Sequence, residues 1–163
     1  KAGATVFLGD FFKTLIPCIL VRHFFQNQPE MVNLLVLYTA FGVILGHNYP
    51  FYMGFKGGKG IAATAGLLVA MDLRVTAVCL IAFILIVAVT RYVSLGSLAV
   101  VIIYLIEVVV YGQMGGFGVK LPYLYEMYGI AAFLMLSAFY KHKANIVRLM
   151  NGTENKISIG KKK

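Results

Sequence analysis

Long apolar runs alternate with short polar segments along this chain, and these runs predict membrane-spanning helices. A helix rises about 1.5 Å per residue, so about 20 residues cross the hydrocarbon core of a bilayer. Several of the runs are shorter, which is common where Gly- and Ala-rich helices pack tightly around a site. The six candidates are Val6 to Phe25, Met31 to Gly46, Gly60 to Met71, Thr76 to Val89, Leu95 to Tyr111 and Tyr123 to Tyr140. The pattern therefore predicts an all-α fold, a polytopic bundle of six membrane helices that forms one domain over residues 1–163.

The composition agrees with a membrane protein. Of the 163 residues, 60% are hydrophobic and 13% are charged. Soluble globular domains are about 45–50% apolar and about 25% charged, and disordered chains have low hydrophobicity. The composition therefore argues against both of those classes, and the length leaves room for a single domain.

The basic residues are distributed unevenly, and their positions predict the orientation of the chain in the membrane. The chain has 15 Lys and Arg against 6 Asp and Glu, for a net charge of +9. Six spans place both termini on one side, together with the loops 47–59 and 90–94 and a tail of residues 141–163. That side carries Lys1, Lys56, Lys59, Arg91, Lys141, Lys143, Arg148, Lys156, Lys161, Lys162 and Lys163, and the other side carries Arg22, Arg74 and Lys120. Cytoplasmic loops are enriched in Lys and Arg, so we expect both termini in the cytoplasm.

Several kinds of functional site have no signature in the sequence. No RNA-binding signature or zinc-finger spacing occurs, so no nucleic-acid partner is expected. Cys18 and Cys79 lie in apolar runs without CxxC spacing, which favours buried thiols over a disulfide or a metal site. The Gly-x-Ser-x-Gly and His-Glu-x-x-His motifs are also missing. We therefore expect no metal, no cofactor and no Ser–His–acid triad.

A basic, glycine-rich loop joins the second and third spans. Its glycines let backbone N–H groups approach an anion closely, its lysines supply positive charge, and the N-terminus of the next helix also favours anions. The residues that carry this pattern are Lys56, Gly57, Gly58, Lys59 and Gly60. The loop therefore predicts phosphate binding, and the alternative is a flexible loop that only sets the topology. It is not a Walker A motif, because no Gly-x-x-x-x-Gly-Lys-Ser/Thr pattern occurs.

Two further polar segments are expected on the same side of the membrane. Arg91, Ser94 and Ser97 lie in a tight turn, where the hydroxyl groups are suited to contact phosphate or a developing oxyanion. The alternative for Ser94 is a helix N-cap. In the tail, helical spacing places His142 and Asn145 on one face. That face is suited to orient a hydroxyl substrate, whereas the basic residues around it are equally suited to bind anionic lipid headgroups.

Charged residues also occur inside the first span. Asp10 and Lys13 are three residues apart, so they share one face of the helix. Charges within a membrane span usually pair with each other or mark a site. Both a mutual ion pair and a direct role in substrate binding are open for these two residues.

Together, four stretches of the chain resemble the bacterial acyl-phosphate:glycerol-3-phosphate acyltransferase family, PlsY. The stretches are Leu8 to Lys13, Gly46 to Gly60, Arg91 to Ser97, and His142 to Leu149 with Gly152 to Glu154. The resemblance implies transfer of a fatty acyl group from acyl phosphate to the 1-hydroxyl of glycerol 3-phosphate. The products would be lysophosphatidic acid and phosphate, in the first step of phospholipid biosynthesis. It also implies an integral protein of the bacterial plasma membrane, with its active site at the cytoplasmic membrane edge.

The resemblance implies roles for individual residues as well. The catalytic residues would be Lys59, Ser97, His142 and Asn145, with Ser97 as the direct serine contact. Substrate and phosphate would be bound by Lys56, Gly57, Gly58, Gly60, Arg91, Ser94, His47 and Glu154. The implied partners are glycerol 3-phosphate, acyl phosphate, membrane lipids and the enzyme that produces acyl phosphate.

The chain departs from the family pattern at its start. The family carries a further membrane helix and a loop reading like Gly-Ser-Gly-Asn-x-Gly-Ala-Thr-Asn upstream, for seven spans in all. Here the sequence begins with Lys1-Ala2-Gly3, which aligns with the segment after that loop. We therefore expect an N-terminally truncated chain that lacks the first helix and the first motif.

The residues favour one mechanism and leave one alternative function open. Because no triad is evident, we expect direct attack of the glycerol hydroxyl on acyl phosphate, with the proton passing to a substrate phosphate oxygen or to His142. The alternative is a small membrane transporter of a phosphorylated metabolite, which would fit the basic loop and the intramembrane charges. No inverted repeat or matched pair of broken helices supports that alternative.

Overall fold

A computed structural model describes residues 2–158 and contains seven α-helices and one short 3-10 helix in that range. The helices are α1 (Ala2–Phe24), α2 (Val32–Asn48), η1 (Phe51–Met53), α3 (Ile61–Met71), α4 (Leu73–Thr90), α5 (Val93–Gln113), α6 (Leu121–Lys141) and α7 (Lys143–Met150). Each of the six predicted runs corresponds to one of α1 to α6, with ends shifted by four residues or fewer. The all-α prediction is confirmed.

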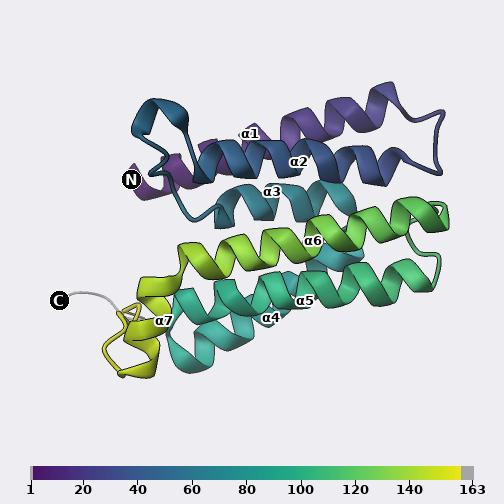
Figure 1. The fold of residues 1–163 in the computed structure, drawn as a ribbon. Helices are drawn as coiled ribbons and strands as arrows, with labels where there is room; N and C mark the ends of the chain where they lie inside the picture. The colour runs from purple at the N-terminus through teal and green to yellow at the C-terminus, as the bar shows by residue number, and fades with distance from the viewer. Residues whose placement is uncertain (1, 159–163) are drawn as a thin grey trace.

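Helices α1 to α6 run up and down through one bundle (Figure 1). Helices α1, α2 and α3 pack on one another in one half, and α4, α5 and α6 pack side by side in the other. Contacts between α2 and α6 and between α3 and α4 join the halves. The start of α1 and the short helix α7 lie at the same end of the bundle.

A glycine sets the close packing of α1 on α3. Gly66 in α3 is buried, and a Cβ atom at this position would lie 2.5 Å from the carbonyl oxygen of Phe11 and 3.1 Å from Cβ of Thr14. Small residues at helix crossings allow backbones to approach closely in membrane bundles. The Ala- and Gly-rich sequence of α3 therefore serves tight packing.

Not all six helices are equally suited to cross a bilayer. Within the described residues, four segments are long and apolar enough: Gly3–Phe24, Val32–Met53, Leu73–Thr90 and Val93–Gln113. Helix α3 has 11 residues, so it extends about 16 Å at 1.5 Å per residue, roughly half of the hydrocarbon core. Helix α6 is long enough, with 21 residues, but it is not among these four apolar segments.

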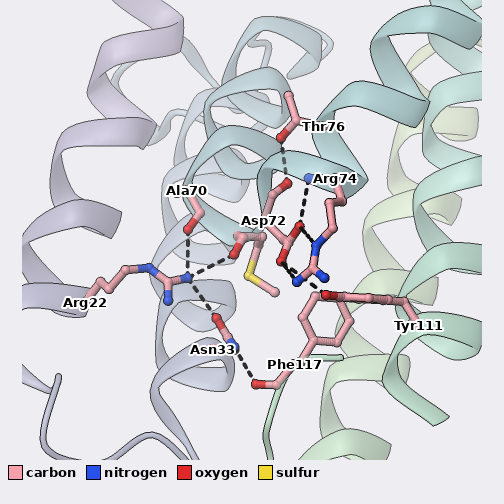
Figure 2. Close-up of polar contacts among 9 residues, drawn as sticks. Arg22, Asn33, Ala70, Asp72, Arg74, Thr76, Tyr111 and Phe117 are labelled. Carbon is pink, nitrogen blue, oxygen red and sulfur yellow. Dashed lines mark hydrogen bonds and ion pairs between the residues drawn. The ribbon is translucent and has the colours of Figure 1, made fainter. Parts of the chain in front are cut away.

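A polar cluster ties the helices together where α1 and α3 end and α4 begins, and Figure 2 shows its contacts. Arg22 Nη2 donates to Asn33 Oδ1 at 2.7 Å, to the carbonyl oxygen of Ala70 at 2.7 Å and to that of Met71 at 3.1 Å. Asn33 Nδ2 in turn donates to the carbonyl oxygen of Phe117 at 2.7 Å. A single guanidinium group thereby satisfies carbonyls at the C-terminus of α3, which have no partner within the helix.

Candidate active site

Six of the predicted site residues line one pocket. The pocket lies at the end of the bundle where α3 and α5 begin and α6 ends, and its volume is about 500 Å³. The six residues are Lys59, Ser94, Ser97, His142, Asn145 and Glu154. The remaining wall consists of Phe7, Ile61, Ala62, Phe83, Val93, Asn155, Lys156 and Ile157. Residues far apart in the sequence therefore meet in one polar cavity with an apolar side.

A chain of hydrogen bonds crosses this pocket. Lys59 Nζ donates to Asn145 Oδ1 at 2.7 Å, and Asn145 Nδ2 donates to Glu154 Oε1 at 2.8 Å. The same carboxylate oxygen accepts the Ser94 hydroxyl at 3.0 Å. The amide of Asn145, which is 6% exposed, is thus fixed in orientation and holds the Lys59 ammonium group at the pocket.

Glu154 joins the tail to the helices. Its side chain is 6% exposed, and its second oxygen, Oε2, accepts a hydrogen bond from Arg148 Nε at 2.8 Å. The hydrogen bonds from Asn145, and next those from Arg148 and Ser94, lower the pKa of Glu154 below its usual value. Glu154 is therefore an ionised acceptor that holds the side chains of Ser94, Asn145 and Arg148 together.

His142 is a buried side chain at the pocket. Its side chain is 2% exposed, and Nδ1 lies 2.8 Å from the carbonyl oxygen of Ala138. Because a carbonyl oxygen only accepts, Nδ1 carries the proton and Nε2 is the acceptor nitrogen. Burial lowers the pKa of His142 below 6.5, and the positive charge of Lys59 lowers it further. The imidazole is therefore neutral at neutral pH.

The two serines lie in the first two turns of α5. The N-cap of α5 is Tyr92, without a side-chain cap bond, so the alternative interpretation of Ser94 as the N-cap is wrong. Ser94 Oγ donates to Glu154, and Ser97 Oγ donates to the carbonyl oxygen of Val93 at 2.9 Å. Because both hydroxyl hydrogens are used within the protein, the oxygens are left as acceptors toward the pocket.

The predicted site residues of the loop 46–60 line two different pockets. Four of its predicted site residues line a second pocket of about 480 Å³ that shares no lining residue with the first. They are His47, Lys56, Gly57 and Gly58, and Asp10 and Lys13 lie in the same wall. Lys13 Nζ lies 2.6 Å from Asp10 Oδ1 and 2.7 Å from His47 Nδ1, so the pairing of Asp10 with Lys13 is confirmed.

The glycines of this loop serve a tight backbone turn. The amide of Gly57 donates to the carbonyl oxygen of Asn48, and that of Gly58 to the carbonyl oxygen of His47, both at 3.2 Å. A Cβ atom at Gly57 would lie 2.0 Å from the His47 carbonyl oxygen, and one at Gly58 would lie 2.2 Å from His47 Nε2. Gly57 and Gly58 do not have a positive φ, whereas Gly60, the N-cap of α3, has a φ of +79°.

Arg91 lies outside the pocket. It ends α4 in the left-handed conformation, with φ of +64°, and its side chain is exposed. Its carbonyl oxygen accepts the amide of Ile157 at 2.9 Å. The part of Arg91 that is engaged at the site is thus its backbone, which anchors the tail.

Sequence reasoning missed two parts of the site. Asn155, Lys156 and Ile157 complete the pocket wall, and their position next to Glu154 was the only signal for them. An apolar groove of about 290 Å³ also adjoins the pocket, sharing Phe7, Ile61 and Phe83 with it. Its other lining residues come from α1, α3, α4 and α5: Phe11, Thr64, Ala65, Leu68, Val69, Thr76, Cys79, Leu80 and Val100.

The chain is similar to known proteins of one family. The family model for glycerol-3-phosphate acyltransferase matches residues 1–152. The glycerol-3-phosphate acyltransferase of Clostridioides difficile (strain 630) is 40% identical over 164 residues, which cover 100% of this chain and 74% of that protein. That of Carboxydothermus hydrogenoformans is 37% identical over 163 residues, covering 98% of this chain and 73% of that protein.

Two crystal structures also match. Both are of PlsY (YgiH), an integral membrane glycerol 3-phosphate acyltransferase, in its glycerol 3-phosphate form and its lysophosphatidic acid form. The first has a TM-score of 0.81 and 30% sequence identity, and the match covers 97% of this chain and 72% of that one. The second has a TM-score of 0.80 at the same identity, covering 97% and 74%. The chain is therefore an integral membrane protein that belongs to the glycerol-3-phosphate acyltransferase family of the PlsY type.

Proposed function

We propose that this chain transfers a fatty acyl group from acyl phosphate to the 1-hydroxyl of glycerol 3-phosphate, giving lysophosphatidic acid and inorganic phosphate. The observation that carries the proposal is the pocket in which Lys59, Ser97, His142 and Asn145 meet. It combines a cation for phosphate, acceptors for a hydroxyl group and a neutral imidazole. The transporter alternative is set aside because the chain belongs to a family of acyltransferases.

The reaction needs no covalent intermediate. The oxygen of the glycerol 1-hydroxyl forms a bond to the acyl carbonyl carbon, and the bond from that carbon to the phosphate oxygen breaks. The hydroxyl proton passes to His142 Nε2 or to a phosphate oxygen, and the phosphate leaves with the electron pair of the broken bond. Lys59 stabilises the charge of substrate phosphate, and the fixed acceptor oxygens of Ser94 and Ser97 orient the attacking hydroxyl.

The apolar groove beside the pocket is suited to the acyl chain of the donor. Its lining is almost wholly hydrophobic, and Phe7, Ile61 and Phe83 border both cavities. The acyl phosphate would then lie with its chain in the groove and its carbonyl carbon in the polar pocket.

The location of the pocket supports a cytoplasmic site at the membrane edge. Lys56, Lys59, Lys141, Lys143 and Arg148 all belong to segments at this end of the bundle. A concentration of basic residues marks the cytoplasmic side of bacterial plasma-membrane proteins. In this proposal α3 and α6 complete six spans, both termini are cytoplasmic, and residues 141–163 form a cytoplasmic tail of the single domain.

Acyl transfer measured with defined donors tests the proposal. The purified chain in detergent or lipid is supplied with labelled glycerol 3-phosphate and either acyl phosphate or acyl-CoA, and lysophosphatidic acid is quantified. We expect product from acyl phosphate only. Product from acyl-CoA only would contradict the donor, and folded protein that yields no product would contradict the function. An acyl group found on Ser94 or Ser97 by mass spectrometry would exclude direct attack.

A further inference from the structure

The tail segment of residues 153–157, which we call the strap, forms one wall of the polar pocket. It is held at both ends, because the amide of Thr153 donates to the carbonyl oxygen of Arg148 at 2.8 Å and that of Ile157 to the carbonyl oxygen of Arg91 at 2.9 Å. Between these points, Glu154 is bonded to α5 and α7 as described above. The strap therefore presents its side chains to the pocket from a fixed backbone.

Lys156 is the basic residue of the strap. It lines the pocket, its side chain is exposed, and its ammonium nitrogen lies 5.3 Å from the centroid of the Tyr92 ring. An exposed cation–π contact is weaker than a charge-assisted hydrogen bond to phosphate. The flexible stem of the lysine therefore allows its ammonium group to leave the ring when phosphate enters the pocket.

Among the described residues that line the pocket, the charges match a phosphate dianion when Lys156 is counted with Lys59. Glu154 is ion-paired with Arg148 at 2.8 Å, and His142 is neutral, so these groups add no net charge. The two lysines, Lys59 and Lys156, are left with a combined charge of +2. A phosphate monoester carries about −1.5 to −2 at pH 7, so Lys59 alone leaves it undercompensated.

We propose that Lys156 is a second substrate-binding cation, which contacts the phosphate group of a substrate together with Lys59. This inference rests on the proposed function. Two substrates carry the required chemistry, glycerol 3-phosphate and acyl phosphate, and the experiment separates them.

The test compares Lys156→Met with Lys143→Met. Lys143 is a matched control, because its ammonium nitrogen also lies over an aromatic ring, 4.8 Å from the centroid of Tyr140, but it does not line the pocket. For each variant, KM is measured once with glycerol 3-phosphate varied and once with acyl phosphate varied, together with kcat and Tm. Loss of one charge-assisted contact should raise KM for the substrate it binds by about tenfold. We expect that rise for Lys156→Met only, an unchanged Tm, and recovery in Lys156→Arg.

A second variant and a binding measurement distinguish a phosphate contact of Lys156 from its packing on Tyr92. If Lys156 acted only by packing on Tyr92, Tyr92→Leu would raise KM as much as Lys156→Met, and that result would overturn the proposal. Unchanged KM for both substrates in Lys156→Met would overturn it as well. If the wild-type chain binds glycerol 3-phosphate but forms no product, the proposed function fails separately. The stabilisation of Tm by glycerol 3-phosphate, compared between wild type and Lys156→Met, then decides whether Lys156 contacts that substrate.

Discussion

Replacement of Lys59 by Met tests the central part of the proposed mechanism. The substitution keeps most of the aliphatic stem and removes the ammonium group that lies 2.7 Å from Asn145 Oδ1. Lys59 is exposed, and the hydrogen bond it leaves lies at the pocket, where water can replace it. The cost to the free energy of unfolding should therefore be no more than about 1 kcal/mol.

The effect on activity should be much larger. A hydrogen bond between a charged donor and phosphate contributes about 1.5–3 kcal/mol, and each 1.4 kcal/mol corresponds to about tenfold. The Lys59→Met variant should therefore lose about 10- to 150-fold in kcat/KM, because Lys156 is the only other lysine among the described residues that line the pocket.

The assay is formation of labelled lysophosphatidic acid from acyl phosphate, with Tm measured in the same detergent. Lys56→Met is the matched control, because Lys56 lies three residues earlier in the same loop but lines the second pocket. We expect that control to retain kcat/KM close to wild type. A near-normal kcat/KM in Lys59→Met, or an equal loss in both variants, would refute the assignment of the substrate to the first pocket.

Gly57→Ala should lower stability by about 1–3 kcal/mol, measured by thermal denaturation, because the new Cβ would lie 2.0 Å from the His47 carbonyl oxygen. The acid limb of the kcat/KM profile should have its midpoint below pH 6.5, because burial lowers the pKa of His142 and activity falls only when its Nε2 is protonated; a midpoint above 6.5 contradicts this. The stability that ionised Glu154 contributes should be present at pH 4.5 and above and be lost as the pH falls through its lowered pKa, so Glu154→Gln should flatten the dependence of Tm on pH at the acid end. Arg22→Met should lower the free energy of unfolding by about 1–3 kcal/mol while KM for glycerol 3-phosphate stays unchanged, because its hydrogen bonds lie at the opposite end of the bundle.

The sequence alone determined the helices and the membrane class of this protein. Apolar runs of helical length leave few alternatives, since a backbone in lipid must satisfy its own hydrogen bonds. The ends of the predicted runs differ from the observed helices by a few residues, because a polar residue such as Asp72 caps a helix outside the hydrophobic run. Asp72, for example, accepts the amide of Arg74 and starts α4 three residues before the hydrophobic run.

The family resemblance also came from the sequence, because its motifs are local. The spacing of His142 and Asn145 predicts that they share one helical face, and both side chains line the first pocket. For the same reason, the adjacent residues of the 46–60 loop were expected to bind one phosphate group together.

Only the tertiary structure decided which of these local motifs meet. Lys59 and Asn145 are 86 residues apart in the sequence, and Ser94 and Glu154 are 60 residues apart. No local sequence pattern predicts that the two residues of either pair meet. The turn at Gly57 and Gly58 sends Lys56 into one pocket and Lys59 into another, although the two lysines are three residues apart. Packing of helices brings distant side chains together and turns neighbouring side chains away from each other. Which side chains line a pocket therefore depends on how the helices cross and on the path of the backbone.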